Sequence, residues 1–373
     1  MWHGGLILPP HIQRRYDELV TRAQRATDVA GVFEAVSPRL RQIVAFDAAV
    51  WMATDPATGL CRAPMWFDNA RRNPQGIEDE FLVDDVNKFH DLARAEVPVG
   101  ALRAATGGRP GRSSRYRRRL RPDAFNDELR AVLRVGRGHW GSVILLRGDG
   151  LPPFSEADVA VLAALSEPLG RALRACARID ARRWVATDVG AGLLLFGAGG
   201  ELSSINDEAL HWLGELPDTR LPDPARPHEI ELPPSVAGVV LRARGAFPDG
   251  DGAGAWGRVQ SRSGRWLVCH ASALRDAGGG VTGTALVIGP ARTTDLAPII
   301  VEAHELTARE QEIARLIARG VSTAEIAGRL YLSTHTVRDH IKATFEKLDV
   351  SSRGELVAKL FAEPHGRAPA AAS

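Results

Sequence analysis

The residues best suited to a chemical role lie near the C-terminus, in the stretch LSTHTVRDHIKATFEKL from Leu332 to Leu348. Arg338 and Lys342 lie one helical turn apart, with His335 and Asp339 beside them. An arginine can donate two hydrogen bonds to O6 and N7 of guanine, and a lysine one turn later can reach a neighbouring base or a phosphate. The opposite face is apolar and is made of Val337, Ile341, Phe345 and Leu348. The pattern fits a helix that reads DNA, and it also fits an ordinary amphipathic surface helix.

Groups that flank these side chains could contact DNA as well. At the start of the helix, Ser333, Thr334 and Thr336 offer hydroxyls and backbone N–H groups to a phosphate. Asp339 could accept a hydrogen bond from cytosine N4 or hold Arg338 in place. The residues predicted to contact DNA are Ser333, Thr334, His335, Thr336, Arg338, Asp339 and Lys342, with Lys347, Ser352 and Arg353 as flanking phosphate contacts.

Four short helices are predicted around this stretch because the sequence marks their ends clearly. The signals are two capping boxes, Thr307 with Glu310 and Ser322 with Glu325, a C′ glycine at Gly320 and an N-cap at Ser333. Asp349 to Ser352 breaks the third helix, and Arg353 to Phe361 forms the last one. A short helix, a tight turn and a longer capped helix with a polar outer face is the helix-turn-helix plan.

The segments LTARE, GVSTAEIAGRL, LSTHTVRDHIKATFEKL and VSSRGELV follow one another in register between residues 306 and 357. They resemble the LuxR/GerE-type helix-turn-helix of bacterial transcription regulators. The resemblance implies an all-α four-helix domain over 304–363, whose third helix reads DNA and whose last helix pairs two subunits through Leu356, Val357 and Leu360. Asp339 departs from the family pattern, in which that position is often uncharged. We expect a linker over 292–303 before this domain and a disordered tail over 364–373 after it.

The bulk composition is that of a globular protein with two or three domains: 373 residues, 45% hydrophobic, 25% charged and a net charge of +2. This charge is too small to indicate nucleic-acid binding by itself, so any basic surface must be local. Cys61, Cys176 and Cys269 form no CxxC pair and no zinc-spaced cluster, and His335 and His340 are interpreted as helix-surface residues rather than metal ligands. Without a signal peptide or a membrane-spanning run, we expect a reduced, cytoplasmic protein with no membrane partner.

The region 11–180 alternates helices with antiparallel strands. Two helical patterns, the second opening at Asp28, precede the strand DAAVWMATD and its partner LCRAPMWF, and DELRAVLRVGRGHWGSVILLR folds back around GRG. This order resembles a GAF domain, a small-molecule sensor fold found at the N-terminus of actinobacterial LuxR-type regulators. The arginine run RPGRSSRYRRRLRP over 109–122 is interpreted as a solvated loop and helix face rather than a nucleic-acid patch.

The helix that follows Ser155 carries an apolar seam with heptad spacing: Leu162, Leu165, Leu169, Ala172, Cys176 and Ile179. The seam could close the core of the GAF-like domain or pair two subunits. Pro168 argues against a long coiled coil because proline interrupts helix hydrogen bonding. Both interpretations stay open at the level of the sequence.

The region 185–291 begins with a strand, a glycine turn, a second strand and a helix capped by Asn206. Three further strands are predicted, AWGRVQS, RWLVCHASAL and TGTALVIG, with a helix SVAGVVLRARG before them. The order resembles a PAS domain. Such a domain can hold haem, flavin, a metabolite or nothing, and no cofactor is predicted here because SSINDEALH lacks the flavin-binding cysteine and the histidines fit structural roles.

The predicted fold class is multidomain α+β, with GAF-like and PAS-like antiparallel-sheet domains before the helix-turn-helix. We expect a homodimeric regulator whose partners are double-stranded DNA, a second copy of itself and an unknown small-molecule or protein signal, with RNA polymerase as a further candidate. An alternative is a sensor whose GAF/PAS region acts mainly as a protein-interaction module, in a sigma-factor-like or enzyme-regulatory role. No nucleophile elbow, Walker loop or HExxH motif is found, so an enzyme is not expected.

Overall fold

The computed structural model describes residues 9–72, 75–177, 189–217, 219, 230–245 and 255–360. The chain forms two compact units. One consists of Met1–Cys176 with Gly190–Pro290, and the other of Ala177–Val189 with Ala291–Ser373. The first unit combines two antiparallel sheets with helices, and the described residues of the second unit form helices, so the predicted α+β fold class is confirmed. The predicted tail over 364–373 lies outside the described residues.

The first sheet has five antiparallel strands in the order β2-β1-β5-β4-β3. Its strands are β1 (Ala48–Thr54), β2 (Cys61–Asp68), β3 (Val99–Ala101), β4 (Phe125–Val135) and β5 (Gly138–Gly148). The predicted pairing of β1 with β2 and the β4–β5 hairpin around GRG are both present. Gly136 takes the positive φ of 58° that this tight turn requires.

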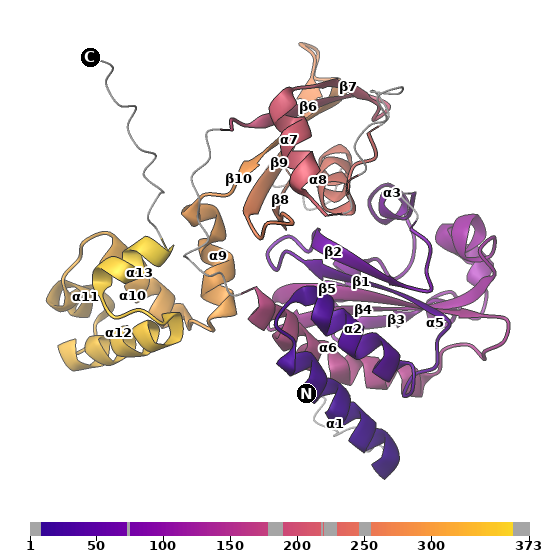
Figure 1. Cartoon of the computed structure of the whole chain (residues 1–373), viewed down its shortest axis with the longest axis horizontal. Helices are drawn as coiled ribbons and strands as arrows, with labels where there is room; N and C mark the ends of the chain where they lie inside the picture. Colours follow the sequence, from indigo (N-terminus) through magenta and orange to yellow (C-terminus); the bar gives the residue numbers. More distant parts are fainter. Residues whose placement is uncertain are drawn as a thin grey trace. The chain divides into compact units, whose positions relative to one another are not determined.

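Three helices, α1 (Pro10–Arg25), α2 (Val29–Leu40) and α6 (Glu156–Cys176), cover one face of this sheet (Figure 1). Asp28 caps α2 by accepting from Gly31 N, and Ser155 and Asp158 exchange hydrogen bonds at the start of α6, as the sequence predicts. The described part of the α6 seam is largely buried in its own chain, at Leu162, Leu165, Leu169 and Ala172. The seam therefore closes the core, and the alternative that it pairs two subunits is wrong for these four residues.

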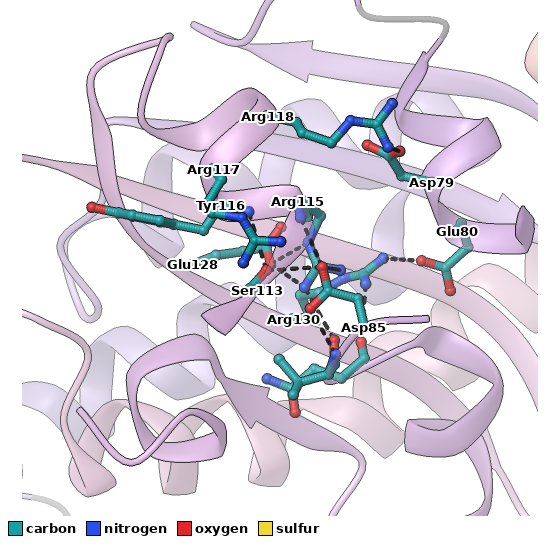
Figure 2. A network of polar contacts seen from close by, with 12 residues as sticks. Asp79, Glu80, Asp85, Ser113, Arg115, Tyr116, Arg117, Arg118, Glu128 and Arg130 are labelled. Atoms are coloured by element: carbon teal, nitrogen blue, oxygen red, sulfur yellow. Dashed lines mark hydrogen bonds and ion pairs between the residues drawn. The ribbon is translucent and has the colours of Figure 1, made fainter. Parts of the chain in front are cut away.

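The same unit contains the short helices α3 (Gln75–Leu82), α4 (Phe89–Arg94) and α5 (Leu102–Ala105), the 3₁₀ turn η1 (Pro110–Arg112) and the π-helical turn η2 (Tyr116–Leu120). Of these, α4, α5 and η2 contact β4. The interpretation of 109–122 as a solvated run is wrong at Arg115, which is buried. Its Nη2 lies 2.7 Å from Glu128 Oε2, and its backbone N–H donates to Asp85 Oδ2 at 2.7 Å (Figure 2). Burial opposes ionisation of Asp85, but hydrogen bonds from Arg115 and Ser113 outweigh it and lower the pKa of the carboxyl.

A second five-stranded antiparallel sheet has the order β7-β6-β10-β9-β8. Its strands are β6 (Gly192–Gly197), β7 (Leu202–Ile205), β8 (Ala255–Gln260), β9 (Trp266–Arg275) and β10 (Val281–Pro290). Helices α7 (Asp207–Glu215) and α8 (Pro234–Arg244) pack against it. Asn206 caps α7 by accepting from Ala209 N, as predicted.

A buried ion pair joins the two sheets within this unit. Arg258 of β8 places Nε 2.6 Å from Asp55 Oδ2 and Nη2 2.9 Å from Oδ1, and neither side chain is exposed to solvent. A second buried guanidinium, Arg62 of β2, lies near this pair and packs on the Trp266 ring at 5.5 Å from its centroid. Two cations therefore share one carboxylate in a region without solvent.

The second unit contains α9 (Thr293–Ala303), α10 (Ala308–Ala318), α11 (Thr323–Leu330), α12 (Thr334–Leu348) and α13 (Arg353–Leu360). The expectation of a linker over 292–303 is wrong, because Leu296, Ile299 and Ile300 are buried on the helix α9, which packs against α13. The four predicted helices are all present, and both predicted capping boxes are formed. Gly320, with a φ of 75°, ends α10 in a Schellman motif in which Val321 N donates to Leu316 O.

Candidate nucleic-acid interface

The outer face of α12 is polar and open to solvent. Thr334, His335, Arg338, Asp339 and Lys342 are exposed on it. The helix starts at Ser333, whose hydroxyl accepts from Thr336 N at 3.0 Å, so one of the free N–H groups of the first turn is satisfied. The remaining N–H groups of this turn stay available to an anion such as a DNA phosphate.

The inner face of α12 is less completely buried than its apolar pattern suggests. Val337 and Leu348 are fully buried, as predicted, whereas Ile341 and Phe345 are half-buried. These two side chains, together with Val350, line a groove of about 690 Å³ that Arg338 and Lys342 border. Apolar surface therefore lies directly beside the two basic side chains.

Charge pairing on this face differs from one of the expected arrangements. Asp339 does not hold Arg338; its Oδ2 lies 2.9 Å from Nδ1 of His335, one turn earlier. Lys342 is 3.9 Å from Glu346, an exposed pair that stabilises little. Among the described residues no carboxylate forms an ion pair with Arg338, so its guanidinium can reach a ligand without breaking an existing contact.

Lys347, predicted to contact a phosphate, is instead part of the contact between α10 and α12. Its Nζ lies 2.8 Å from Glu310 Oε2 and donates to Glu305 O at 3.1 Å. Glu310 also accepts from Thr307 N at 2.7 Å, so one largely buried carboxylate caps α10 and fixes α12 against it. Burial works against the charge of Glu310, but the hydrogen bonds from Lys347 and Thr307 lower the pKa of its carboxyl. The lysine positions the polar face of α12 rather than extending it.

The two other flanking residues are also engaged within the unit. Arg353 donates from Nη1 to Val321 O at 3.1 Å and from Nη2 to the Thr323 hydroxyl at 2.6 Å, which ties α13 to the start of α11. The hydroxyl of Ser352 accepts from Glu355 N at 3.1 Å and so caps α13. These contacts give both residues a structural role that the sequence did not predict.

The residues expected to pair two subunits are partly unavailable for that role. Leu356 and Leu360 have no exposed surface, and α13 packs against α9 and α10 of its own chain. Val357 is half-buried and Ala358 is exposed. The assignment of Leu356 and Leu360 to a subunit interface is therefore wrong, because both belong to the core of the helical unit.

Tyr331 is a candidate contact that the sequence pattern did not reveal. It ends α11 in the left-handed conformation, with a φ of 54°, and its side chain is 96% exposed. Its backbone N–H donates to Ala327 O, so the ring is carried by an ordered turn between α11 and α12. A large aromatic at the turn of a helix-turn-helix is the signal that could have identified it.

Comparison with known proteins agrees with this geometry. A family described as bacterial regulatory proteins of the luxR family matches residues 304–360. The spore germination protein GerE of Bacillus subtilis is 42% identical over 55 residues, which make up 15% of this chain and 74% of GerE. This chain belongs to the LuxR family of bacterial regulatory proteins. The expected resemblance is thereby confirmed for the C-terminal helices.

Another relative is matched over a smaller part of its length. The transcriptional regulatory protein DesR of Bacillus subtilis is 43% identical over 58 residues, and the chain spans 29% of it. Among solved structures, Escherichia coli SdiA aligns over 94% of this chain and 98% of its own, at 12% identity and a TM-score of 0.34.

In the part of the chain that the structure describes, no helix combines the length and the apolar character needed to cross a bilayer. The same residues bring no three metal-binding side chains together.

Proposed function

We propose that this chain, a LuxR-type DNA-binding transcriptional regulator, reads a specific operator with α12 and binds it as a homodimer. The exposed face of α12 supports this most, because Arg338 and Lys342 lie one turn apart on it and Arg338 has no described ion-pair partner. Arg338 would donate to O6 and N7 of a guanine in the major groove, and Lys342 would contact the next base or a phosphate. Asp339, held by His335, would face a cytosine amino group rather than the backbone.

The start of α12 would bind the DNA backbone. Ser333, Thr334 and Thr336 place hydroxyls there, and the helix N-terminus carries a partial positive charge. Contacts of this kind fix the register of the helix on the duplex, while base contacts give the specificity. Tyr331, exposed at the preceding turn, would make a further contact with the DNA backbone.

Pairing of two subunits would use the exposed side of α13, with Val357 and Ala358, since Leu356 and Leu360 are buried. Two such units would fit half-sites about one helical turn apart, ~10 bp from centre to centre. The two sheet domains, GAF-like over 11–180 and PAS-like over 185–291, would sense a small molecule or a partner protein. Binding of this molecule or protein would control the spacing between the two α12 helices of the dimer. RNA polymerase would be the protein that the regulator contacts at the operator.

The test is selection of duplexes from a random DNA library with the full-length protein, followed by affinity measurements on the selected sequence. Arg338→Ala is expected to cost about 1–3 kcal/mol and to relax the preference at one base pair. Arg22→Ala, which removes an exposed arginine of α1, is the matched control and is expected to change neither. Unchanged affinity and preference in Arg338→Ala would refute the groove assignment, and failure to enrich any sequence would refute the function.

A further inference from the structure

A cavity of about 680 Å³ adjoins the face of the first sheet that α1, α2 and α6 leave uncovered. Two cross-strand rows form its floor. In one row Val50 pairs with Phe67 and Ile144, and in the other Met52 pairs with Met65 and Ser142. Five of these six side chains are apolar, so the floor suits the body of an organic molecule rather than a free inorganic ion.

Helices α3 and α4 form walls over this floor, with Ile77, Phe81, Phe89 and Ala93 among the lining residues. Residues of α8 from the second sheet domain line the cavity as well. A volume of this size lies within the range of roughly 300–1,000 Å³ that is usual for small-molecule sites. The cavity is therefore large enough for an organic molecule of metabolite size.

The polar part of the lining is strongly cationic. From the first sheet domain alone, six arginines and two glutamates line the cavity, which leaves a formal excess of four positive charges. Arg130 of β4 is largely neutralised: its Nη2 lies 2.6 Å from Glu80 Oε2, its Nη1 donates to Asn87 O, and its guanidinium lies over the Phe89 ring at 3.9 Å from the centroid (Figure 2). It anchors the sheet to the residues around α3 and α4.

Arg119 has no such neutralisation. Its neighbours Arg115 and Arg118 pair with Glu128 and Asp79, but no ion pair joins Arg119 to a carboxylate among the described residues, and its Nε is buried without a hydrogen-bond partner. Burial lowers the pKa of this guanidinium because the charged form loses solvation.

The position of Arg119 is fixed by close packing at the start of α3. Its guanidinium lies against Gly76, where a β-carbon would collide with Nη1 and Nη2. The glycine thus leaves room for a cation whose charge an anionic ligand would compensate.

We propose that this cavity binds a small organic anion with an apolar body, and that Arg119 binds its oxyanion head. The apolar rows of the sheet contact the body of the ligand. The excess positive charge of the walls favours a ligand that carries a negative charge at its head. The proposal rests on the proposed function in that such an anion would be the signal that the sheet domains sense. A carboxylate head and a phosphate head both present anionic oxygens that accept hydrogen bonds from a guanidinium.

The probe that matches this description is 8-anilinonaphthalene-1-sulfonate, an anion with an apolar body that fluoresces when bound, and N-phenyl-1-naphthylamine is its neutral counterpart. Both are titrated into the full-length protein without DNA. Arg119→Met is expected to weaken binding of the sulfonate roughly 10-fold to 100-fold and to change binding of the neutral probe less than about twofold. Decanoate and decyl phosphate, added as competitors, distinguish the two kinds of head.

Arg118→Met is the matched control, since Arg118 is mostly exposed, pairs with Asp79 and does not line the cavity. It is expected to leave both affinities within about twofold of the unaltered chain. Equal sulfonate binding by Arg119→Met and Arg118→Met would overturn the proposal, and so would an equal loss of both probes in Arg119→Met.

Two further variants keep the test decisive if Arg119→Met does not fold. Arg119→Lys retains the charge and is expected to bind the sulfonate within about tenfold of the unaltered chain. Ile144→Trp fills the floor and should abolish binding of both probes; unaltered binding by this variant would also overturn the proposal. Because the readout involves no DNA, a failure here is distinct from a failure of Arg338→Ala to affect the operator.

Discussion

Replacing Asp55 by asparagine should destabilise the sheet unit more than removal of any exposed ion pair. Asp55 and Arg258 are both fully buried and share two hydrogen bonds, at 2.6 and 2.9 Å. Burial lowers the pKa of the neighbouring Arg62 to about 10, and the Asp55 carboxylate limits that fall. Asp55→Asn would leave two buried guanidinium groups without a counter-charge.

The expected cost is about 3–5 kcal/mol, since breaking a buried pair leaves an uncompensated charge in a region of low dielectric. Arg258→Met alone should cost a similar amount, and the double variant should cost at least about 2 kcal/mol less than the two single changes added together. A coupling of this sign follows because the second change removes one of the charges that the first left unpaired.

The assay is equilibrium urea unfolding of the full-length chain, followed by tryptophan fluorescence, since the buried Trp51 and Trp212 report on the first and second sheet. Glu167→Gln is the control. Glu167 lies 2.6 Å from Arg171, a distance equal to the shortest one between Asp55 and Arg258, but its side chain is 58% exposed. This control should cost no more than about 0.5 kcal/mol. If Asp55→Asn lowers the free energy of unfolding no more than Glu167→Gln does, burial does not determine how much the Asp55–Arg258 pair stabilises the unit, and the prediction is refuted.

Three further predictions concern other sites. Burial lowers the pKa of His139 to about 4 in the folded chain, whereas it is about 6.5 in the unfolded chain. At a pH between these two values, only the unfolded chain binds the proton at His139. The free energy of unfolding should therefore fall by up to about 1.4 kcal/mol per pH unit as the pH falls. Urea unfolding measured at several pH values should show that His139→Gln removes this contribution to the pH dependence. Leu356→Ala should lower the stability of the helical unit by about 2–5 kcal/mol in thermal unfolding, whereas Val357→Asp should weaken the proposed dimer in analytical ultracentrifugation with little loss of stability. Lys347→Met should leave Glu310 buried without its cation and cost about 1–3 kcal/mol in the same thermal unfolding measurement; an unchanged melting temperature would contradict this.

Features set by near neighbours in the chain could be predicted from the sequence. Thr307 with Glu310, Ser322 with Glu325, and the GRG turn all act over a few residues, and each is present as expected. Contacts between distant residues could not be predicted in this way. Glu310 meets Lys347 across 37 positions and Asp55 meets Arg258 across 203, and no local pattern marks either partner.

The predictions for 292–303 and for Arg115 are wrong for the same physical reason, because both segments make contacts with residues distant in the chain. The sequence predicts a linker over 292–303, yet α9 forms there because Leu296, Ile299 and Ile300 are buried. Arg115 resembled its solvated neighbours because its partner Glu128 lies on β4. An arginine run predicts exposure only on average, and the fold decides which member meets a carboxylate.

The distinction between positioning and contact determines how a loss of DNA binding should be interpreted. The slope of log affinity against log salt concentration is negative, and removing a side chain that neutralises one phosphate makes it shallower by about 0.9. Lys342→Ala should change the slope in this way if Lys342 contacts the backbone. Lys347→Met should instead lower the affinity without changing the slope, because Lys347 holds Glu310 and the carbonyl of Glu305. A change in slope for Lys347→Met would mean that this ion pair opens on DNA, and the lysine would then belong to the interface as the sequence first suggested.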